Sequence, residues 1–206
     1  MKFSQNGTTI IESIVVMMII VVWVVGMYNI FIKSQHIASS SSHRVEAITI
    51  AREWIEALSN IRDTNWFLFW ANNANCWHTM NYDGSCITAA SGVTMIQTGT
   101  YIIYRDTVSN RWYLTHKTIN GDYSTGTYKN DFRVNLETIG SGNFYTQSGG
   151  VNFSPIFTRE IKISYLDSEN PPQKMKVESI VKWSDNARNE WNYEVKFDTI
   201  LSNWKK

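Results

Sequence analysis

Proline and cysteine are scarce in this 206-residue chain, and neither sign of charge is in excess. It has 3 Pro and 2 Cys, and 19 Lys and Arg against 18 Asp and Glu leave a formal net charge of +1. Two cysteines are too few for a scaffold of several disulfides or for a four-cysteine metal site. A protein whose main partner is nucleic acid usually has a clear basic excess, which is missing here.

The common catalytic fingerprints are missing as well. The sequence has no Walker loop, no H-E-x-x-H, no G-x-S-x-G and no glycine-rich dinucleotide motif. Acidic loops at 122–131 and 167–170 contain oxygens suited to Ca²⁺, but they lack EF-hand spacing and are better explained as solvated loops. We therefore expect no enzyme activity, no cofactor and no metal site.

One long apolar run stands out near the start of the chain. Residues 14–32 read IVVMMIIVVWVVGMYNIFI, and Asn29 is the plainly polar member. As a helix this stretch spans about 28 Å, close to the thickness of a bilayer core. The run is too long for the 7–15 apolar residues of a secretory signal peptide. An ordinary membrane anchor explains its length, but not the nearby carboxylate of Glu12.

The segment before this run resembles the type III leader of prepilins, as found in type IV pilins and type II secretion pseudopilins. It reads MKFSQNG-TTIIE, with Glu12 five positions after Gly7. The resemblance implies that a membrane-bound peptidase cleaves between Gly7 and Thr8 on the cytoplasmic side and then methylates the amine of Thr8. Thr8 stands where the family usually has Phe or Met.

The resemblance also implies a role for Glu12 in assembly. Pilin helices bundle in a water-poor filament core, where an unpaired carboxylate and an unpaired N-terminal amine are both penalised. Pairing Glu12 of one subunit with the Thr8 amine of its neighbour offsets both penalties. Such a pair also sets the register between subunits, as buried polar groups do in coiled coils.

An amphipathic pattern follows the apolar run. Between residues 45 and 66 apolar side chains recur at steps of three and four, which predicts a helical stripe that packs on the domain that follows. We expect one helix from about Thr8 to Asp63, with a weak point in the serine run 39–42. The string AREWIEALSNIRDTNW resembles the helix end of minor pilins. The stripe consists of Ala47, Ile50, Ala51, Trp54, Leu58 and Ile61.

The remaining chain is predicted to be mostly antiparallel sheet. No helical periodicity is evident after Asp63, whereas TREIKISYL, KMKVESIVKW and WNYEVKFDT alternate apolar and polar residues. This alternation predicts three strands of a meander, each with one face buried against the stripe around Trp54 and Leu58. Weaker strands are expected near 101–104, 111–115 and 132–136. The predicted fold class is α+β.

The C-terminal part adds to the resemblance to minor pilins. FTREI at 157–161, V-x-S-x-V-x-W at 177–183 and TILSNW at 199–204 are familiar from that group. Residues 66–155 resemble nothing that we can name, and 121–155 have the composition of long exposed loops. Tyrosines near Lys129 and Arg133 suggest stacking on single-stranded DNA, but the balanced charge argues against it.

Cys76 and Cys86 are expected to form a disulfide. The resemblance places the domain outside the cytoplasm, where disulfides persist, and the small loop they close contributes about 3 kcal/mol. A metal site that adds His78 is the alternative, although its spacing is not standard. A Cys–His nucleophile pair is less favoured still. The remaining histidines are assigned to solvated surface or left without a role: His36, His43 and His116.

Together these features predict a structural minor pilin or pseudopilin subunit. The expected regions are a leader (1–7), a membrane-spanning and filament-core helix (8–32), its amphipathic continuation (33–63) and an extracytoplasmic β-rich domain (64–206). Expected partners are other pilin subunits, prepilin peptidase and the membrane, and no nucleic acid. Before assembly the chain would be single-pass in the cytoplasmic membrane with its N-terminus inside. Afterwards it would lie in an extracellular or periplasmic filament. The alternative is an anchored binding module for adhesion that never polymerises.

Overall fold

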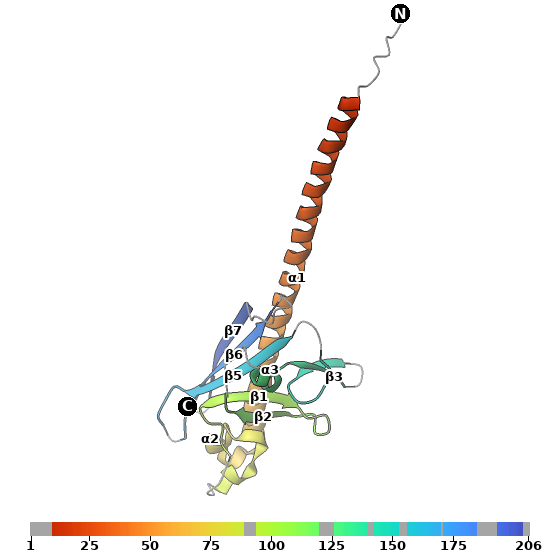
Figure 1. The fold of residues 1–206 in the computed structure, drawn as a ribbon. Helices are drawn as coiled ribbons and strands as arrows, with labels where there is room; N and C mark the ends of the chain where they lie inside the picture. Colours follow the sequence, from red (N-terminus) through yellow and green to blue (C-terminus); the bar gives the residue numbers. More distant parts are fainter. Residues whose placement is uncertain are drawn as a thin grey trace, which may run out of the picture. The chain divides into compact units, whose positions relative to one another are not determined.

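The computed structural model describes residues 10–88, 94–119, 126–139, 142–152, 156–169, 171–184 and 193–203. The chain divides into two compact units, Met1–His43 and Arg44–Lys206, and we call the second the globular unit. Helix α1 (Ile10–Leu68) contributes to both (Figure 1). The predicted leader and the residues Gly7 and Thr8 lie outside the described residues.

Helix α1 is longer than the sequence pattern predicts. It continues unbroken through the serine run 39–42, the predicted weak point, and it ends at Leu68 rather than near Asp63. The extension has a tertiary cause. The buried amide of Asn65 donates hydrogen bonds to the carbonyls of Trp77 and Thr79 at 3.4 and 2.7 Å, which fix the last turns. Such non-local contacts override the local helix signal.

A five-stranded antiparallel sheet forms the centre of the globular unit. Its order is β2–β1–β5–β6–β7, and the last three strands form the predicted meander. Strand β6 has the predicted bounds, and the strands predicted near 101–104 and 111–115 are present as β1 and β2. The bounds are Gly99–Arg105 (β1), Trp112–Lys117 (β2), Phe157–Tyr165 (β5), Lys174–Trp183 (β6) and Tyr193–Ser202 (β7).

The region between β2 and β5 differs from the prediction. Phe132 ends helix α3 (Gly126–Phe132) instead of starting a strand, and strand β3 (Asn135–Ile139) pairs with β4 (Gly142–Thr146). Short helices also occur after Asp63, although no helical periodicity is evident there in the sequence. These helices are too short to show a 3.6-residue period in the sequence. The other short helices are η1 (Trp70–Asn72), α2 (Asn73–Cys76), η2 (Met80–Tyr82) and η3 (Gly84–Thr88).

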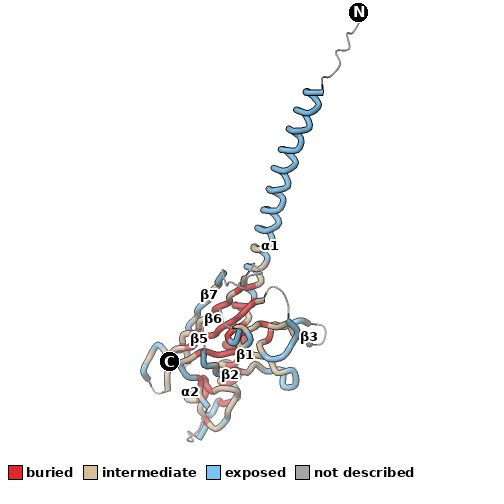
Figure 2. Tube along the Cα trace, viewed as in Figure 1, coloured by how far each residue is buried: buried red, intermediate tan, exposed pale blue. Residues whose placement is uncertain are grey.

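The predicted helical stripe packs against one face of the sheet. Every residue of the stripe is buried, and Trp54 and Leu58 are each 1% exposed. They share one core cluster with side chains of β1, β2, β5, β6 and β7, and Figure 2 shows buried residues along β5 and β6. Burial of this kind is the main favourable term that holds helix and sheet together. The sheet members of the cluster are Tyr101, Ile103, Leu114, Ile161, Ile163, Met175, Val177 and Leu201.

The opposite face of the sheet is partly covered too, so the expectation of one buried face is wrong for β5. Five successive residues of this strand, 157–161, are buried. Helix α3 supplies the second layer: its Tyr128 and Phe132 cluster with Ile102 of β1, and the Tyr128 hydroxyl donates to Glu160 at 3.0 Å. On the same face Ile180 lies opposite Glu160 and is also buried, which explains its apolar character in β6.

Strands β1 and β5 pair over a short stretch, and a side chain continues the contact. Their register covers Gly99 to Tyr101. Beyond it the amide of Gln147 donates to the carbonyl oxygens of Arg159 and Phe132 at 2.7 and 3.0 Å. The same amide accepts from the backbone N–H of Ile103 at 3.4 Å. Gln147 thereby satisfies backbone groups that the divergence of the strands would leave unpaired.

Candidate functional site

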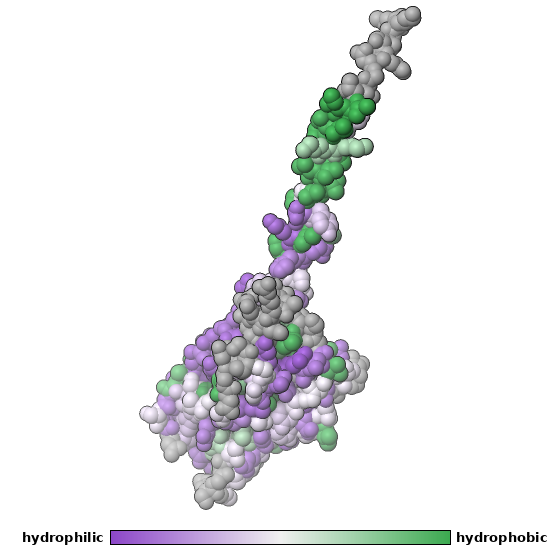
Figure 3. Space-filling view, viewed as in Figure 1, coloured by the Kyte–Doolittle hydropathy of each residue, from purple (hydrophilic) through white to green (hydrophobic). Residues whose placement is uncertain are grey.

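The first half of α1 is an apolar surface. From Ile10 to Ile32 each large apolar side chain is at least 48% exposed, and Figure 3 shows this segment as a hydrophobic band. By length and composition the helix is able to cross a membrane. In water such a surface is strongly unfavourable, so the segment requires lipid or apolar helices around it.

Two polar residues of this segment, Glu12 and Asn29, differ in their interactions within the helix. Asn29 donates one N–H of its side-chain amide to the carbonyl oxygen of Val25 in its own helix at 3.0 Å, which satisfies part of its hydrogen-bonding capacity. Glu12 lies in the first turn of α1, where the helix dipole favours a carboxylate. The two residues are about 26 Å apart along the axis, at 1.5 Å per residue. The pairing of Glu12 with the amine of Thr8 stays a prediction.

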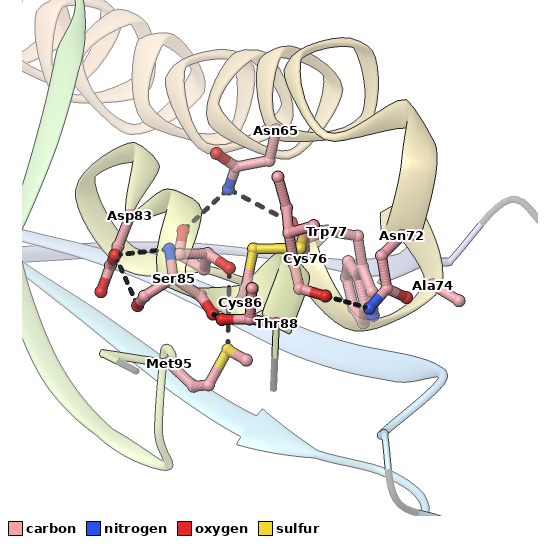
Figure 4. The surroundings of a disulfide bond; sticks show 12 residues. Asn65, Asn72, Ala74, Cys76, Trp77, Asp83, Ser85, Cys86, Thr88 and Met95 are labelled. Carbon is pink, nitrogen blue, oxygen red and sulfur yellow. Dashed lines mark hydrogen bonds between the residues drawn. A yellow bond between two sulfur atoms is a disulfide. The ribbon is translucent and has the colours of Figure 1, made fainter. Parts of the chain in front are cut away.

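Cys76 and Cys86 form the expected disulfide (Figure 4). It joins α2 to η3, and both cysteines are buried beside Phe69. Because each sulfur is bonded to the other, no thiolate is left for the alternative metal site or for a nucleophile. Among the described residues no group of three metal-ligating side chains occurs.

His78 is a core residue rather than a ligand. Its ring centroid lies 5.2 Å from that of Trp77 and 6.0 Å from that of Tyr165. Burial lowers the pKa of His78 to about 4, because the protonated ring would lose its hydration. Its Nδ1 is buried and has no hydrogen-bond partner within the described residues. His78 is therefore neutral at pH 7.

The other histidines lie apart from one another. His36 is exposed on α1, and His43 is partly buried at the boundary of the two units. His116 of β2 packs edge-on against Tyr101, with ring centroids 5.1 Å apart. Its ring also lies over Gly99, where an added Cβ would lie 2.5 Å from the His116 Nε2, so a larger residue there would require the His116 ring to move.

Described residues of the loops weighed above as sites for Ca²⁺ or single-stranded DNA make contacts within the protein. Asp167 accepts the backbone N–H of Gln173 with both carboxylate oxygens at 3.1 Å, which closes the β5–β6 turn. Asp131 pairs with Lys117 at 3.1 Å, while Asp122 and Asn170 lie outside the described residues. Tyr128 is buried at 2% exposure and is not available for stacking on a base.

Two adjoining pockets open beside the segment 94–98, with volumes of about 380 and 340 Å³. The two tyrosine hydroxyls beside these pockets donate hydrogen bonds to backbone carbonyl oxygens. Tyr165 donates to the carbonyl oxygen of Ile96, and Tyr101 donates to that of Gln97 at 2.9 Å. Met95 and Gln97 line both pockets.

Sequence reasoning missed a group of exposed apolar side chains at the end of α1. Phe67 and Trp70 are 73% and 79% exposed although they belong to the globular unit. Because aromatic residues are usually assigned to the core, the residue types of Phe67 and Trp70 did not indicate that these side chains would be exposed. The available signal was the lack of charge around them, since Asp83 is the one charged residue between 64 and 104.

Comparison with known proteins found no matching family model, no matching curated protein and no matching solved structure. What the chain itself shows is a long apolar N-terminal helix followed by an antiparallel sheet on which the helix packs. This arrangement is compatible with a pilin-like architecture.

Proposed function

We propose that this protein is a structural subunit, a minor pilin or pseudopilin, of a type IV pilus-like filament. The observation that supports the proposal best is the first half of α1. It exposes apolar side chains on all sides, has one carboxylate in its first turn and continues into a helix that packs on a sheet. A subunit of this kind is cleaved between Gly7 and Thr8 by prepilin peptidase and N-methylated at Thr8.

The lone carboxylate acts as a register device in this proposal. Buried in a helix bundle, Glu12 loses hydration and needs a cationic partner. The amine of Thr8 on a neighbouring subunit is such a partner, and it exists only after cleavage. Membrane residence before cleavage and helix packing after it then use the same apolar surface.

The globular unit fits residence outside the cytoplasm. The Cys76–Cys86 disulfide is stable where the environment is oxidising. The subunit would be single-pass in the cytoplasmic membrane, with its N-terminus inside, and would then enter an extracellular or periplasmic filament. The choice of minor rather than major subunit rests on the FTREI segment, the terminal strand and a helix without proline.

The test compares Glu12→Val with the matched control Ser13→Val, next to it in the same first turn. Both variants are expressed with the cognate assembly machinery, and the membrane and sheared filament fractions are quantified. We expect equal membrane insertion for both and at least about a tenfold loss of Glu12→Val from filaments, since a buried unpaired amine costs more than 1.4 kcal/mol. Normal incorporation of Glu12→Val would refute the register role.

An anchored binding module that never polymerises is the second candidate, and the exposed aromatic side chains of Phe67 and Trp70 favour it. In that case Glu12 would be replaceable and no subunit would appear in filaments. The same fractionation separates the two functions.

A further inference from the structure

The larger of the two pockets, about 380 Å³ in volume, is lined by the segment 95–98 and by the end of β5 with the turn that follows it. We call it the β5–β6 pocket. Its volume is in the range of sites that hold small ligands. Six of its lining residues carry the argument: His78, Ile96, Tyr165, Asp167, Glu169 and Pro172.

Hydrogen bonds hold the walls of the β5–β6 pocket together. The Tyr165 hydroxyl donates to the carbonyl oxygen of Ile96, which joins β5 to the segment 95–98. On the other side the indole N–H of Trp77 donates to the carbonyl oxygen of Pro172 at 3.1 Å, which fixes the β5–β6 turn to the core. The pocket is therefore largely pre-formed, and binding to it loses little conformational entropy.

The lining includes apolar and aromatic groups without positive charge at pH 7. The rings of His78 and Tyr165 meet edge-on with centroids 6.0 Å apart, and Ile96 and Pro172 add apolar atoms. His78 is 5% exposed, and burial lowers its pKa to about 4, so its ring is neutral. Its Nδ1 has no hydrogen-bond partner within the described residues. Such a lining suits an alkyl chain that ends in a hydrogen-bond donor.

The charged side chains of the lining are both acidic. They are Asp167, which is partly buried, and Glu169, which is exposed. The residues known to line the pocket include no lysine or arginine, and Lys174, the first residue of β6, is not one of them. The pocket therefore combines apolar walls with two carboxylates that no basic residue of its lining neutralises.

The negative charge of Asp167 acts on the interior of the pocket. Burial raises the pKa of Tyr165, and the Tyr101 hydroxyl and the Asp167 carboxylate raise it further. Both oxygens of this carboxylate accept one backbone N–H at 3.1 Å, and each has a further lone pair for another donor. A cation in the pocket would thus be attracted and could donate hydrogen bonds.

We propose that the β5–β6 pocket binds a primary alkylammonium group, carried by a lysine side chain or by a free alkylamine. The alkyl chain packs on Ile96, Tyr165 and Pro172, and the ammonium N–H groups donate to the carboxylates of Asp167 and Glu169. An anion would be repelled by both carboxylates. A calcium ion fits less well, because it needs six or more oxygen ligands and the walls are apolar. The inference does not depend on whether the chain polymerises.

The test uses the full chain in dodecyl maltoside micelles, whose uncharged head groups do not compete for a cation site. Long-range ¹H–¹⁵N spectra follow the imidazole signals of the 4 histidines during titration with Nα-acetyl-lysine methylamide. The signals of His78 should move to saturation, with half-saturation below about 10 mM. Those of His36, exposed on α1, should stay in place.

Three further titrations identify the group that is recognised. Nα-acetyl-norleucine methylamide has an alkyl side chain without the ammonium group, and it should bind at least about tenfold more weakly. Binding of the lysine probe should weaken between about 0.05 and 0.5 M salt. n-Butylammonium separates the two sources: equal affinity indicates a free amine, and weaker binding than the lysine probe indicates a lysine side chain of a protein.

Variants locate the site. Glu169→Gln should weaken binding of the lysine probe about two- to fivefold, as expected for an exposed ion pair. Thr98→Arg places a cation in the lining and should abolish it. Glu56→Gln removes the same charge from an exposed position of α1 and should bind like the parent. Near-ultraviolet circular dichroism verifies that each variant is folded.

Three results would overturn the proposal. The first is no saturable movement of the His78 signals with the lysine probe up to about 100 mM, far above the expected half-saturation. The second is equal binding of the norleucine probe, which would show that the pocket recognises the alkyl chain alone. The third is movement of the same signals by calcium chloride at lower concentration than by the lysine probe, which would make the pocket a metal site.

Discussion

The guanidinium carbon of Arg159 lies 3.0 Å from the centroid of the Trp54 ring, so β5 and α1 meet through a cation–π contact. Arg159 is fully buried, and its two terminal nitrogens have no hydrogen-bond partner within the described residues. Glu53, beside Trp54 on the helix, is its electrostatic partner. Burial raises the pKa of Glu53, and the Arg159 charge partly opposes that rise. The opposite charges of Arg159 on β5 and Glu53 on α1 thus each offset part of the cost of burying the other.

A double-mutant cycle measures this coupling. Arg159→Met leaves the partly buried Glu53 with only the weaker influence of Arg105, and we expect it to lower the free energy of unfolding by about 3–5 kcal/mol. Adding Glu53→Gln should recover at least about 1 kcal/mol, because the second change removes the unpaired charge. Urea unfolding followed by tryptophan fluorescence gives the energies, and Arg111→Met on the exposed β1–β2 turn is the control. Additivity within about 0.5 kcal/mol would contradict the coupling.

The lowered pKa of His78 predicts that the protein loses stability in mild acid. Its folded pKa of about 4 lies below the unfolded value of 6.5, so the unfolded chain takes up the proton first. The contribution is complete above pH 6.5 and is lost as the pH falls through 4, by up to about 3 kcal/mol.

The variant His78→Phe keeps a ring between Trp77 and Tyr165 and removes the titration. Its unfolding free energy should therefore fall less than that of the parent between pH 6.5 and 4, measured by urea unfolding. His36→Phe, on the exposed part of α1, should retain the parental slope. Parallel curves for His78→Phe and the parent would show that another group causes the loss.

Because Cys76 and Cys86 form a disulfide, we expect the free energy of unfolding to depend on whether this bond is oxidised or reduced. Cys76→Ala with Cys86→Ala should lower the free energy of unfolding by about 3 kcal/mol, because the cross-link restricts the unfolded chain. Reduction of the parent by dithiothreitol should lower its urea midpoint by a similar amount, while the double variant should not respond. If the reduced and oxidised parent unfold at the same midpoint, the disulfide makes no contribution to stability.

The sheet was predictable where one face meets the helix and the other meets solvent. Met175, Val177, Val181 and Trp183 alternate with lysines and Glu178, and β6 has the predicted bounds. The covering of the opposite face of the sheet by helix α3 was not predictable from the sequence. Arg159 and Glu160 are adjacent charged residues that alternation places on opposite faces, but nothing in the sequence shows that Trp54 covers one and Tyr128 the other. The helix end at Leu68 likewise depends on Asn65 reaching Thr79.

Local patterns predicted one part of the candidate site and missed another. Glu12 and the cysteine pair stand out because a carboxylate near an apolar run, and two cysteines ten positions apart, are unusual in themselves. Phe67 and Trp70 could not be separated from core aromatics such as Trp54, because exposure is a property of the fold. The sequence feature that distinguishes them, missing charge over a long stretch, is visible without the structure.

The N-terminus of the mature protein tests the central claim most directly. Intact-mass and N-terminal peptide mass spectrometry should be performed on the chain expressed with the cognate prepilin peptidase and without it. We expect a chain that begins at Thr8, with a methyl group on its amine, when the peptidase is present, and at Met1 when it is absent. A chain that still begins at Met1 with active peptidase would leave Glu12 without its partner amine and contradict the assignment as a pilin-like subunit.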